Sequence, residues 1–336
     1  MRGKGINYDT GFTPFGDSSR KSFDPEVVRQ ELQVIAEELH CNAVRISGGD
    51  PDRLMTAAEH AAAAGLEVWF SPFPVDMTAE ELLPFFADCA ERAERVRRTG
   101  AEVVLVTGCE MSLFAKGFVP GDDLGSRFAN LGSPTPELLK AMKELPERMN
   151  AFLADAAATA RKHFSGRVTY ASGPWEDLDW TPFDIVSVDA YRDENNAAGF
   201  EEGLRNRFVE GKPLVATEFG CCTYKGAAAK GGLGWTIVER SGDQAVLNGD
   251  YVRDESEQVT YLRDLLPVFE RTGLDSAFWF TFAGYELPHR SDPHVDLDMA
   301  SYGVVKMLEE GPGTGYCSLG WEPKQVFHAL AEAYAS

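Results

Sequence analysis

The chain has 336 residues, of which 44% are hydrophobic, and a formal net charge of −21 at pH 7. This length and apolar content are sufficient for a large core, while the acidic balance argues against binding to nucleic acid or anionic membranes, because phosphate contacts depend on Lys and Arg. The six cysteines include no C-x-x-C pair, and no run is long and apolar enough to span a bilayer, so we expect a cytoplasmic protein with no bound metal or cofactor.

Short apolar strands alternate with amphipathic helices along the chain. The expected strands are Gly5–Tyr8, Asn42–Ile46, Leu66–Phe70, Val103–Thr107, Val168–Ala171, Asp184–Val188, Leu214–Thr217 and Leu274–Thr281. The expected helices run from Pro25 to Leu39, from Pro51 to Gly65, and over Thr78–Arg98, Glu137–His163, Phe200–Phe208, Ser256–Arg271 and Glu322–Tyr334. Because continuous apolar strands are buried on both faces, this alternation predicts parallel β–α units. Eight such units predict a single (β/α)8 TIM barrel domain over residues 1–336.

Long connections follow the fourth, seventh and eighth strands. They cover Ser112–Pro136, Cys221–Glu255 and Ala283–Trp321, and we expect a hairpin in the second that pairs Trp235–Glu239 with Ala245–Val252. In a barrel of this kind these connections lie at the C-terminal ends of the strands, where active sites are built. We therefore expect functional residues there.

Two of the strands end in a glutamate. Strand four runs into Gly-Cys-Glu at Glu110, and strand seven ends at Glu218 in ATEFG. An unpaired charge is costly to bury, so an acid at the end of a buried strand needs a reason. Cleavage of a glycosidic bond uses one protonated and one ionised carboxyl group. The sequence predicts that Glu110 and Glu218 form such a pair; the alternative is two buried, salt-bridged structural acids.

Four other residues are expected at the same end of the barrel. Arg45 ends strand two and could keep one glutamate ionised, although an ordinary salt bridge is the alternative. Asp189 and Tyr191 follow strand six, and Tyr191 could donate a hydrogen bond to the nucleophile or have its hydroxyl satisfied in the core. Trp279 in strand eight could stack on a sugar, or could be a core residue.

Three further features leave alternatives open. The segment Ser291–Asp298 alternates Asp292, His294, Asp296 and Asp298, which suits either an oxygen-rich metal site or a hydrogen-bonded loop. No base accompanies Cys221 and Cys222, so we interpret them as small packing residues. His289, like His294, is a candidate for contact with substrate.

These residues together resemble the clan A glycoside hydrolases, particularly the cellulase-like and mannanase-like members. The resemblance rests on Glu110 in VTGCE, Glu218 in ATEFG, Arg45 in AVRIS, Tyr191 in VDAYR and Trp279 in FWFTF. The tail YGVVK…WEPKQVFHALAEAY is similar to the usual ending of the clan. The resemblance implies a (β/α)8 barrel in which Glu110 is the acid/base and Glu218 the nucleophile of a retaining glycosidase.

One residue departs from that family. An asparagine that binds the sugar 2-hydroxyl normally precedes the acid/base glutamate, and Cys109 stands there in this chain. A thiol is a poor hydrogen-bond donor, so the contact is lost or supplied by another residue. We expect an oligosaccharide or a glycosylated small molecule as substrate, with no nucleic-acid or membrane partner. The alternatives are a repurposed barrel that catalyses another acid/base reaction, such as an elimination, cyclisation or rearrangement, and a barrel that binds sugars or partners without catalysis.

Overall fold

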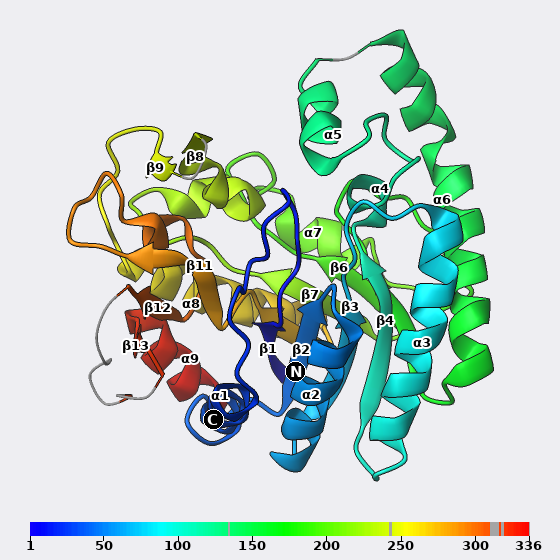
Figure 1. The fold of residues 1–336 in the computed structure, drawn as a ribbon, viewed down its shortest axis with the longest axis horizontal. Helices are drawn as coiled ribbons and strands as arrows, with labels where there is room; N and C mark the ends of the chain where they lie inside the picture. Colours follow the sequence, from blue (N-terminus) through cyan, green and yellow to red (C-terminus); the bar gives the residue numbers. More distant parts are fainter. Residues whose placement is uncertain (134, 242–243, 310–315, 317–318, 336) are drawn as a thin grey trace.

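Eight parallel strands curve into a barrel in the computed structural model, which describes residues 1–133, 135–241, 244–309, 316 and 319–335 (Figure 1). The barrel strands, in their order around the sheet, are β5 (Arg167–Ala171), β4 (Val103–Cys109), β3 (Glu67–Pro72), β2 (Ala43–Gly48), β1 (Gly3–Asp9), β10 (Ser276–Trp279), β7 (Leu214–Phe219) and β6 (Val186–Asp189). A parallel bridge between Ser172 and Val188 joins the two ends of the sheet. The predicted (β/α)8 TIM barrel is confirmed.

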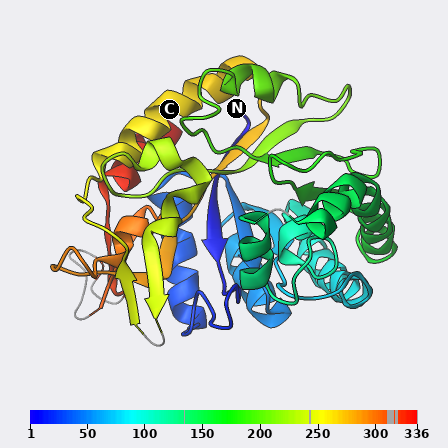
Figure 2. The same ribbon diagram turned by 90° about the horizontal axis from the view of Figure 1, so that it is seen from above.

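Helices surround the strands (Figure 2). They include α1 (Pro25–Glu37), α2 (Pro51–Ala63), α3 (Ala79–Arg97), α6 (Pro136–His163), α7 (Phe200–Arg205), α8 (Ser256–Thr272) and α9 (Gln325–Ala335). Asp24, Asp50 and Thr78 cap the first three of them, and Thr78 forms a capping box with Glu81. No helix in the described ranges is long and apolar enough to cross a membrane.

Side chains fill the inside of the barrel. Trp69 of β3 and Phe278 of β10 have ring centroids 4.8 Å apart, although β2 and β1 separate their strands in the sheet. The two rings therefore meet across the barrel. A Cβ atom on Gly5 of β1 would lie 2.3 Å from the Phe278 ring. Glycine at this position lets the interior close around the aromatic pair.

The long connections contain more regular structure than the sequence predicted. The first holds α4 (Met111–Phe114) and α5 (Leu124–Leu131), where we expected a loop. The second contains a 3-10 segment, η1 (Ala227–Ile237), and a hairpin of β8 (Val238–Ser241) and β9 (Gln244–Leu247), which is shorter than the predicted one. The third contains β11 (Ala283–His289), η2 (Leu297–Ala300), β12 (Val305–Leu308) and β13 (Trp321–Pro323), so the last helix begins later than predicted because the chain first adds a strand.

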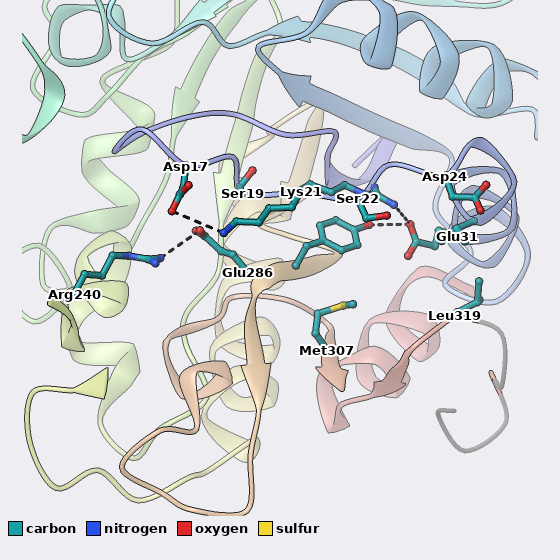
Figure 3. A pocket seen from close by; sticks show the side chains of 13 residues that line it. Asp17, Ser19, Lys21, Ser22, Asp24, Glu31, Arg240, Glu286, Met307 and Leu319 are labelled. Atoms are coloured by element: carbon teal, nitrogen blue, oxygen red, sulfur yellow. Dashed lines mark hydrogen bonds and ion pairs between the residues drawn. The ribbon is translucent and has the colours of Figure 1, made fainter. Parts of the chain in front are cut away.

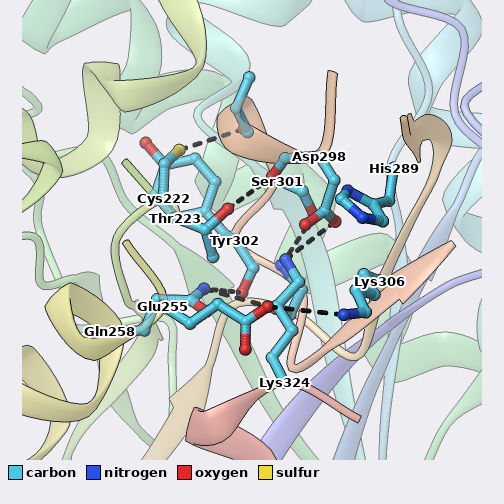
Figure 4. Close-up of polar contacts among 12 residues, drawn as sticks. Cys222, Thr223, Glu255, Gln258, His289, Asp298, Ser301, Tyr302, Lys306 and Lys324 are labelled. Atoms are coloured by element: carbon cyan, nitrogen blue, oxygen red, sulfur yellow. Dashed lines mark hydrogen bonds and ion pairs between the residues drawn. The ribbon is translucent and has the colours of Figure 1, made fainter. Parts of the chain in front are cut away.

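A buried charge cluster joins the second and third connections to the segment before α9 (Figure 4). Lys324 forms an ion pair with Asp298 at 2.9 Å, and both side chains are 1% exposed or less. Arg253 pairs with the same carboxylate at 2.8 Å and with Asp296 at 3.2 Å. Asp296 and Asp298 are therefore engaged by basic side chains, which weakens the interpretation of this segment as a metal site. The segment also turns into η2 instead of staying extended, because Asp296 and Asp298 bind Arg253.

We predict that Lys324→Met destabilises the protein by about 3 kcal/mol, because it leaves the Asp298 carboxylate buried with one basic partner instead of two. Urea unfolding measures the change. Lys306→Met is the matched control, since the Lys306 side chain is 20% exposed and its ion pairs are longer than 3.5 Å; it should cost less than about 1 kcal/mol. Equal losses in the two variants would contradict the prediction.

Candidate active site

The carboxylate of Glu218 is held by two side chains at the C-terminal end of β7. Nη1 of Arg45 donates to Oε1 at 2.6 Å, and the hydroxyl of Tyr191 donates to Oε2 at 2.9 Å. Glu218 is 8% exposed, so this charge lies almost out of water but is paired and hydrogen-bonded. The guanidinium offsets the buried negative charge, and the two hydrogen bonds fix the orientation of the carboxylate. The predicted contacts of Arg45 and Tyr191 with this glutamate are present.

Arg45 is itself oriented by two neighbouring strands. Nε donates to Oγ of Ser71 at 3.1 Å, and Nη1 also donates to Oδ1 of Asn7 at 3.1 Å. The amide of Asn7 donates in turn to the backbone carbonyl of Thr217 at 2.9 Å, directly before Glu218. Strands β1, β2, β3 and β7 therefore all contribute to the position of one ion pair.

Glu110 follows β4 in an unusual backbone conformation. Its φ is 46°, in the left-handed region that residues other than glycine rarely adopt. Glu110 is only partly exposed. Burial, followed by the negative charges of Asp189 and Glu218, raises the pKa of its carboxyl group well above the usual value. A carboxyl group in this environment keeps its proton to higher pH. Glu110 and Glu218 are thus close enough to interact. Of these two glutamates, Glu218 is the one that accepts a hydrogen bond from a guanidinium group within the described residues.

A third carboxyl group lies between these two. Asp189 ends β6 and is 2% exposed; Oδ1 accepts a hydrogen bond from Thr217 at 2.8 Å. The thiol of Cys109 lies 3.5 Å from Oδ2 of Asp189 and 3.7 Å from Oε1 of Glu218. With one proton, the thiol can donate to one of them at a time. Burial followed by the charge of Glu218 raises the pKa of Asp189, and burial followed by the charge of Asp189 raises the pKa of Cys109.

The same three side chains are the ones within the described residues that could hold a metal ion. Possible ligand atoms of Cys109, Asp189 and Glu218 lie within 4.8 Å of one another. Arg45 competes for this position, because its guanidinium already neutralises the Glu218 carboxylate at 2.6 Å. A cation would also meet unfavourable charge from Arg45, and the geometry therefore favours proton chemistry at this site.

Two predicted substrate-binding residues lie elsewhere. Trp279 is fully buried, packs against Phe219 and donates from Nε1 to the carbonyl of Tyr302 at 3.0 Å, so the sugar-stacking prediction is wrong and its core alternative holds. His289 lies in the charge cluster of Figure 4, with Nδ1 3.0 Å from Oδ1 of Asp296. It binds the third connection, not the carboxylate pair, because β11 leads away from the strand ends.

The vicinal cysteines are packing residues, as predicted. Cys221 and Cys222 are buried free thiols, and Sγ of Cys222 donates to the carbonyl of Ala300 at 3.1 Å. The other described cysteines are free as well, while Cys317 lies outside the described residues.

Several residues of the site were not predicted from the sequence. Asn7 and Ser71 support Arg45, as described above, and each lies near the end of an apolar strand where a polar residue could have been noticed. Trp175, after β5, is 46% exposed and donates from Nε1 to Oγ of Ser112 at 3.1 Å, two residues beyond Glu110. Only the fold brings this tryptophan to the acid, so the sequence held no signal for it.

A separate pocket of about 470 Å³ lies beside β11 and the loop after β1 (Figure 3). Neither Glu110 nor Glu218 lines it. Its charges are paired within the pocket wall: Arg20 with Glu31 at 3.0 Å, and Arg240 with Glu286 at 3.3 Å.

We predict that Glu110→Gln and Asp189→Asn stabilise the protein more at pH 8 than at pH 5. Each carboxyl group has a raised pKa, so the folded state keeps its proton after the unfolded chain has lost it, and the free energy of unfolding falls as the pH rises above the unfolded pKa. An amide side chain does not titrate and so avoids this loss of stability. The free energy of unfolding of each variant should exceed that of the wild-type protein by more than about 1 kcal/mol at pH 8.

Thermal unfolding at both pH values measures the effect. Asp122→Asn, at an exposed carboxylate, is the control and should show the same difference from the wild-type protein at both. A stability gain for Glu110→Gln and Asp189→Asn that did not change with pH would contradict the prediction.

Comparison with solved structures identifies similar folds. A GH113 β-1,4-mannanase matches with a TM-score of 0.63 and 16% identity over 100% of this chain and 99% of its own. The GH113 β-mannanase AaManA from Alicyclobacillus acidocaldarius, in complex with ManMIm, matches with a TM-score of 0.61 and 17% identity over 99% of this chain and 97% of its own. Cel5A of Thermotoga maritima, in complex with mannotriose, matches with a TM-score of 0.50 and 13% identity over 89% and 96%.

No protein-family model matches the sequence. No curated protein matches it either. At these sequence identities the structural matches establish the fold alone. The chain has a (β/α)8 barrel similar to those of the two GH113 mannanases and of Cel5A.

Proposed function

We propose that the protein is a retaining glycoside hydrolase acting on an oligosaccharide or a glycosylated small molecule. The observation that carries the proposal is that the two glutamates lie in different electrostatic environments. Arg45 and Tyr191 bind the carboxylate of Glu218, whereas burial and nearby negative charge favour the protonated form of Glu110. Glycosidic cleavage needs one ionised and one protonated carboxyl group.

In the proposed mechanism Glu218 attacks the anomeric carbon and forms a glycosyl-enzyme. Glu110 gives its proton to the leaving oxygen, and then takes a proton from the water that attacks the intermediate. Arg45 and Tyr191 hold the nucleophile in place through the contacts described above. In a substrate complex the two carboxyl groups should lie about 5–5.5 Å apart, whereas an inverting enzyme needs about 6.5–9.5 Å.

Two of the similar structures are β-mannanases, which makes β-mannosides the first substrates to test. A panel of 4-nitrophenyl glycosides that begins with β-mannoside would identify a sugar that is cleaved. Proton NMR of the first product then reports whether the anomeric configuration is retained.

We predict that Glu218→Gln abolishes turnover of the sugar that the wild-type protein cleaves, because an amide cannot form the glycosyl-enzyme. Glu110→Gln should lower kcat by about 10²–10⁴ on a poor leaving group, since it removes the general acid, and by much less on 2,4-dinitrophenyl glycosides, which need little protonation. Steady-state kinetics measure both.

Azide should restore glycosyl transfer in Glu110→Ala and give a product of retained configuration. Asp122→Asn is the control and should match the wild-type protein. Full turnover in Glu218→Gln would exclude the assigned nucleophile.

A second candidate is a different acid/base reaction, such as an elimination or rearrangement, on the same carboxyl groups. It is favoured by the contact of Cys109 with Asp189 and Glu218, because this contact replaces the sugar-binding asparagine expected from the family resemblance. Failure of the wild-type protein to cleave any glycoside in the panel would favour this candidate. Gain of glycoside cleavage in Cys109→Asn would favour a glycosidase scaffold adapted to another substrate.

A further inference from the structure

Three aromatic side chains from three different connections meet above the barrel. Phe15 lies in the loop after β1, Phe128 in α5 after β4, and Trp235 in η1 after β7. Their ring centroids are 6.4 Å apart for Phe15 and Phe128, 6.4 Å for Phe15 and Trp235, and 6.0 Å for Phe128 and Trp235. These separations are those of interacting aromatic pairs. We call these three residues the aromatic arch.

The arch spans the mouth between the strands that carry the two glutamates. Phe128 belongs to the connection that follows Glu110, and Trp235 to the one that follows Glu218. The longer path around the barrel from β4 to β7 passes through β3, β2, β1 and β10, and Phe15 follows β1 in the middle of this path. In Figure 1 the dark blue loop after β1 rises between α5 and the β8 region. The arch therefore closes this side of the mouth.

Both ends of the arch are held by neighbouring connections of the barrel. Next to Phe128, the buried Arg127 donates to the carbonyl of Leu113 at 2.6 Å and also pairs with Asp76. Next to Trp235, the backbone amide of Gly234 donates to the hydroxyl of Tyr302 at 2.9 Å. These contacts hold Phe128 and Trp235 in place independently of each other.

Phe15 completes the arch from a loop whose base is closed by two hydrogen bonds. The backbone amide of Ser19 donates to the carbonyl of Phe12 at 2.8 Å, and Oγ of Ser19 accepts from the amide of Phe12 at 3.0 Å. The ring of Phe12 stacks on Phe73 with centroids 5.3 Å apart. The base of the loop is thus fixed, and Phe15 at its tip is 50% exposed.

The shorter path from β4 to β7 carries a different aromatic residue. It runs through β5 and β6, and Trp175 follows β5. Its ring is half exposed and held by Ser112, two residues after Glu110. A Cβ atom on Gly173 would lie 2.7 Å from this ring, so the glycine leaves room for it. A general acid stands beside the leaving group, and Trp175 lies on that side.

We propose that the aromatic arch restricts the substrate to a terminal sugar, so that the enzyme removes one sugar from the end of a short glycoside while the leaving group lies over Trp175. This inference rests on the proposed glycosidase function. A polysaccharide chain passing through the site would need to extend past both glutamates, and the arch occupies one of the two directions. Discrimination of this kind comes from the shape of the pocket in the transition state.

The experiment compares 4-nitrophenyl β-mannoside with 4-nitrophenyl β-mannobioside. The wild-type protein should release mannose first from the mannobioside and leave 4-nitrophenyl mannoside. Phe15→Ala should open the arch and release mannobiose directly, with at least a tenfold rise in kcat/KM for the mannobioside relative to the mannoside. Phe15→Tyr keeps the ring and should retain the wild-type pattern.

Phe208→Ala is the matched control, because Phe208 is 42% exposed and lies after α7 at the other end of the barrel. It should leave the products unchanged. Direct release of mannobiose by the wild-type protein, or identical product patterns in Phe15→Ala and Phe208→Ala with retained folding, would overturn the proposal.

Failure of the proposed function gives a different result, in which the wild-type protein cleaves no glycoside. Calorimetry with mannose and mannotriose then tests the arch on its own. An affinity that rises with chain length in the wild-type protein overturns the arch proposal. A rise that occurs in Phe15→Ala and is lacking in the wild-type protein supports it.

Discussion

The buried ion pair between Arg45 and Glu218 is the interaction on which the rest of the site depends. Removing two charges from water is costly, and their attraction offsets the cost only where the remaining hydrogen bonds are made. Asn7, Ser71 and Tyr191 supply three such bonds, from β1, β3 and the segment after β6. The arrangement requires a closed barrel, since only closure brings β1, β2, β3, β6 and β7 around one carboxylate. Fold and site are therefore one energetic unit.

Much of this could be predicted from the sequence. Continuous apolar runs identify strands that are buried on both faces, and acids or arginines at their C-terminal ends converge because parallel strands end at the same edge. Glu110, Arg45, Tyr191 and Glu218 were found in this way. Trp279 was wrongly predicted to face the substrate. In a strand of unbroken apolar residues the sequence does not reveal which alternate side chains face the barrel interior. Phe278 faces the interior, so Trp279 faces the helices.

The connections could not be predicted, since their structure depends on contacts far apart in the sequence. The arch brings Phe15 to Trp235, and the buried pair of Asp298 and Lys324 joins the third connection to the segment before α9. Neither contact leaves a local pattern of spacing or composition. His289 was assigned to the substrate because its connection starts at the mouth, and only the charge cluster shows where that connection goes.

The backbone at Glu110 has a consequence for engineering. A glutamate with a φ of 46° occupies a conformation that glycine or asparagine would adopt at lower cost. A procedure that selects sequences for thermostability alone would replace this residue early, and would discard the acid before changing any buried strand. The position would thus look like a defect to a stability score. Variant libraries intended to raise the thermal stability of this barrel should keep Glu110 unchanged.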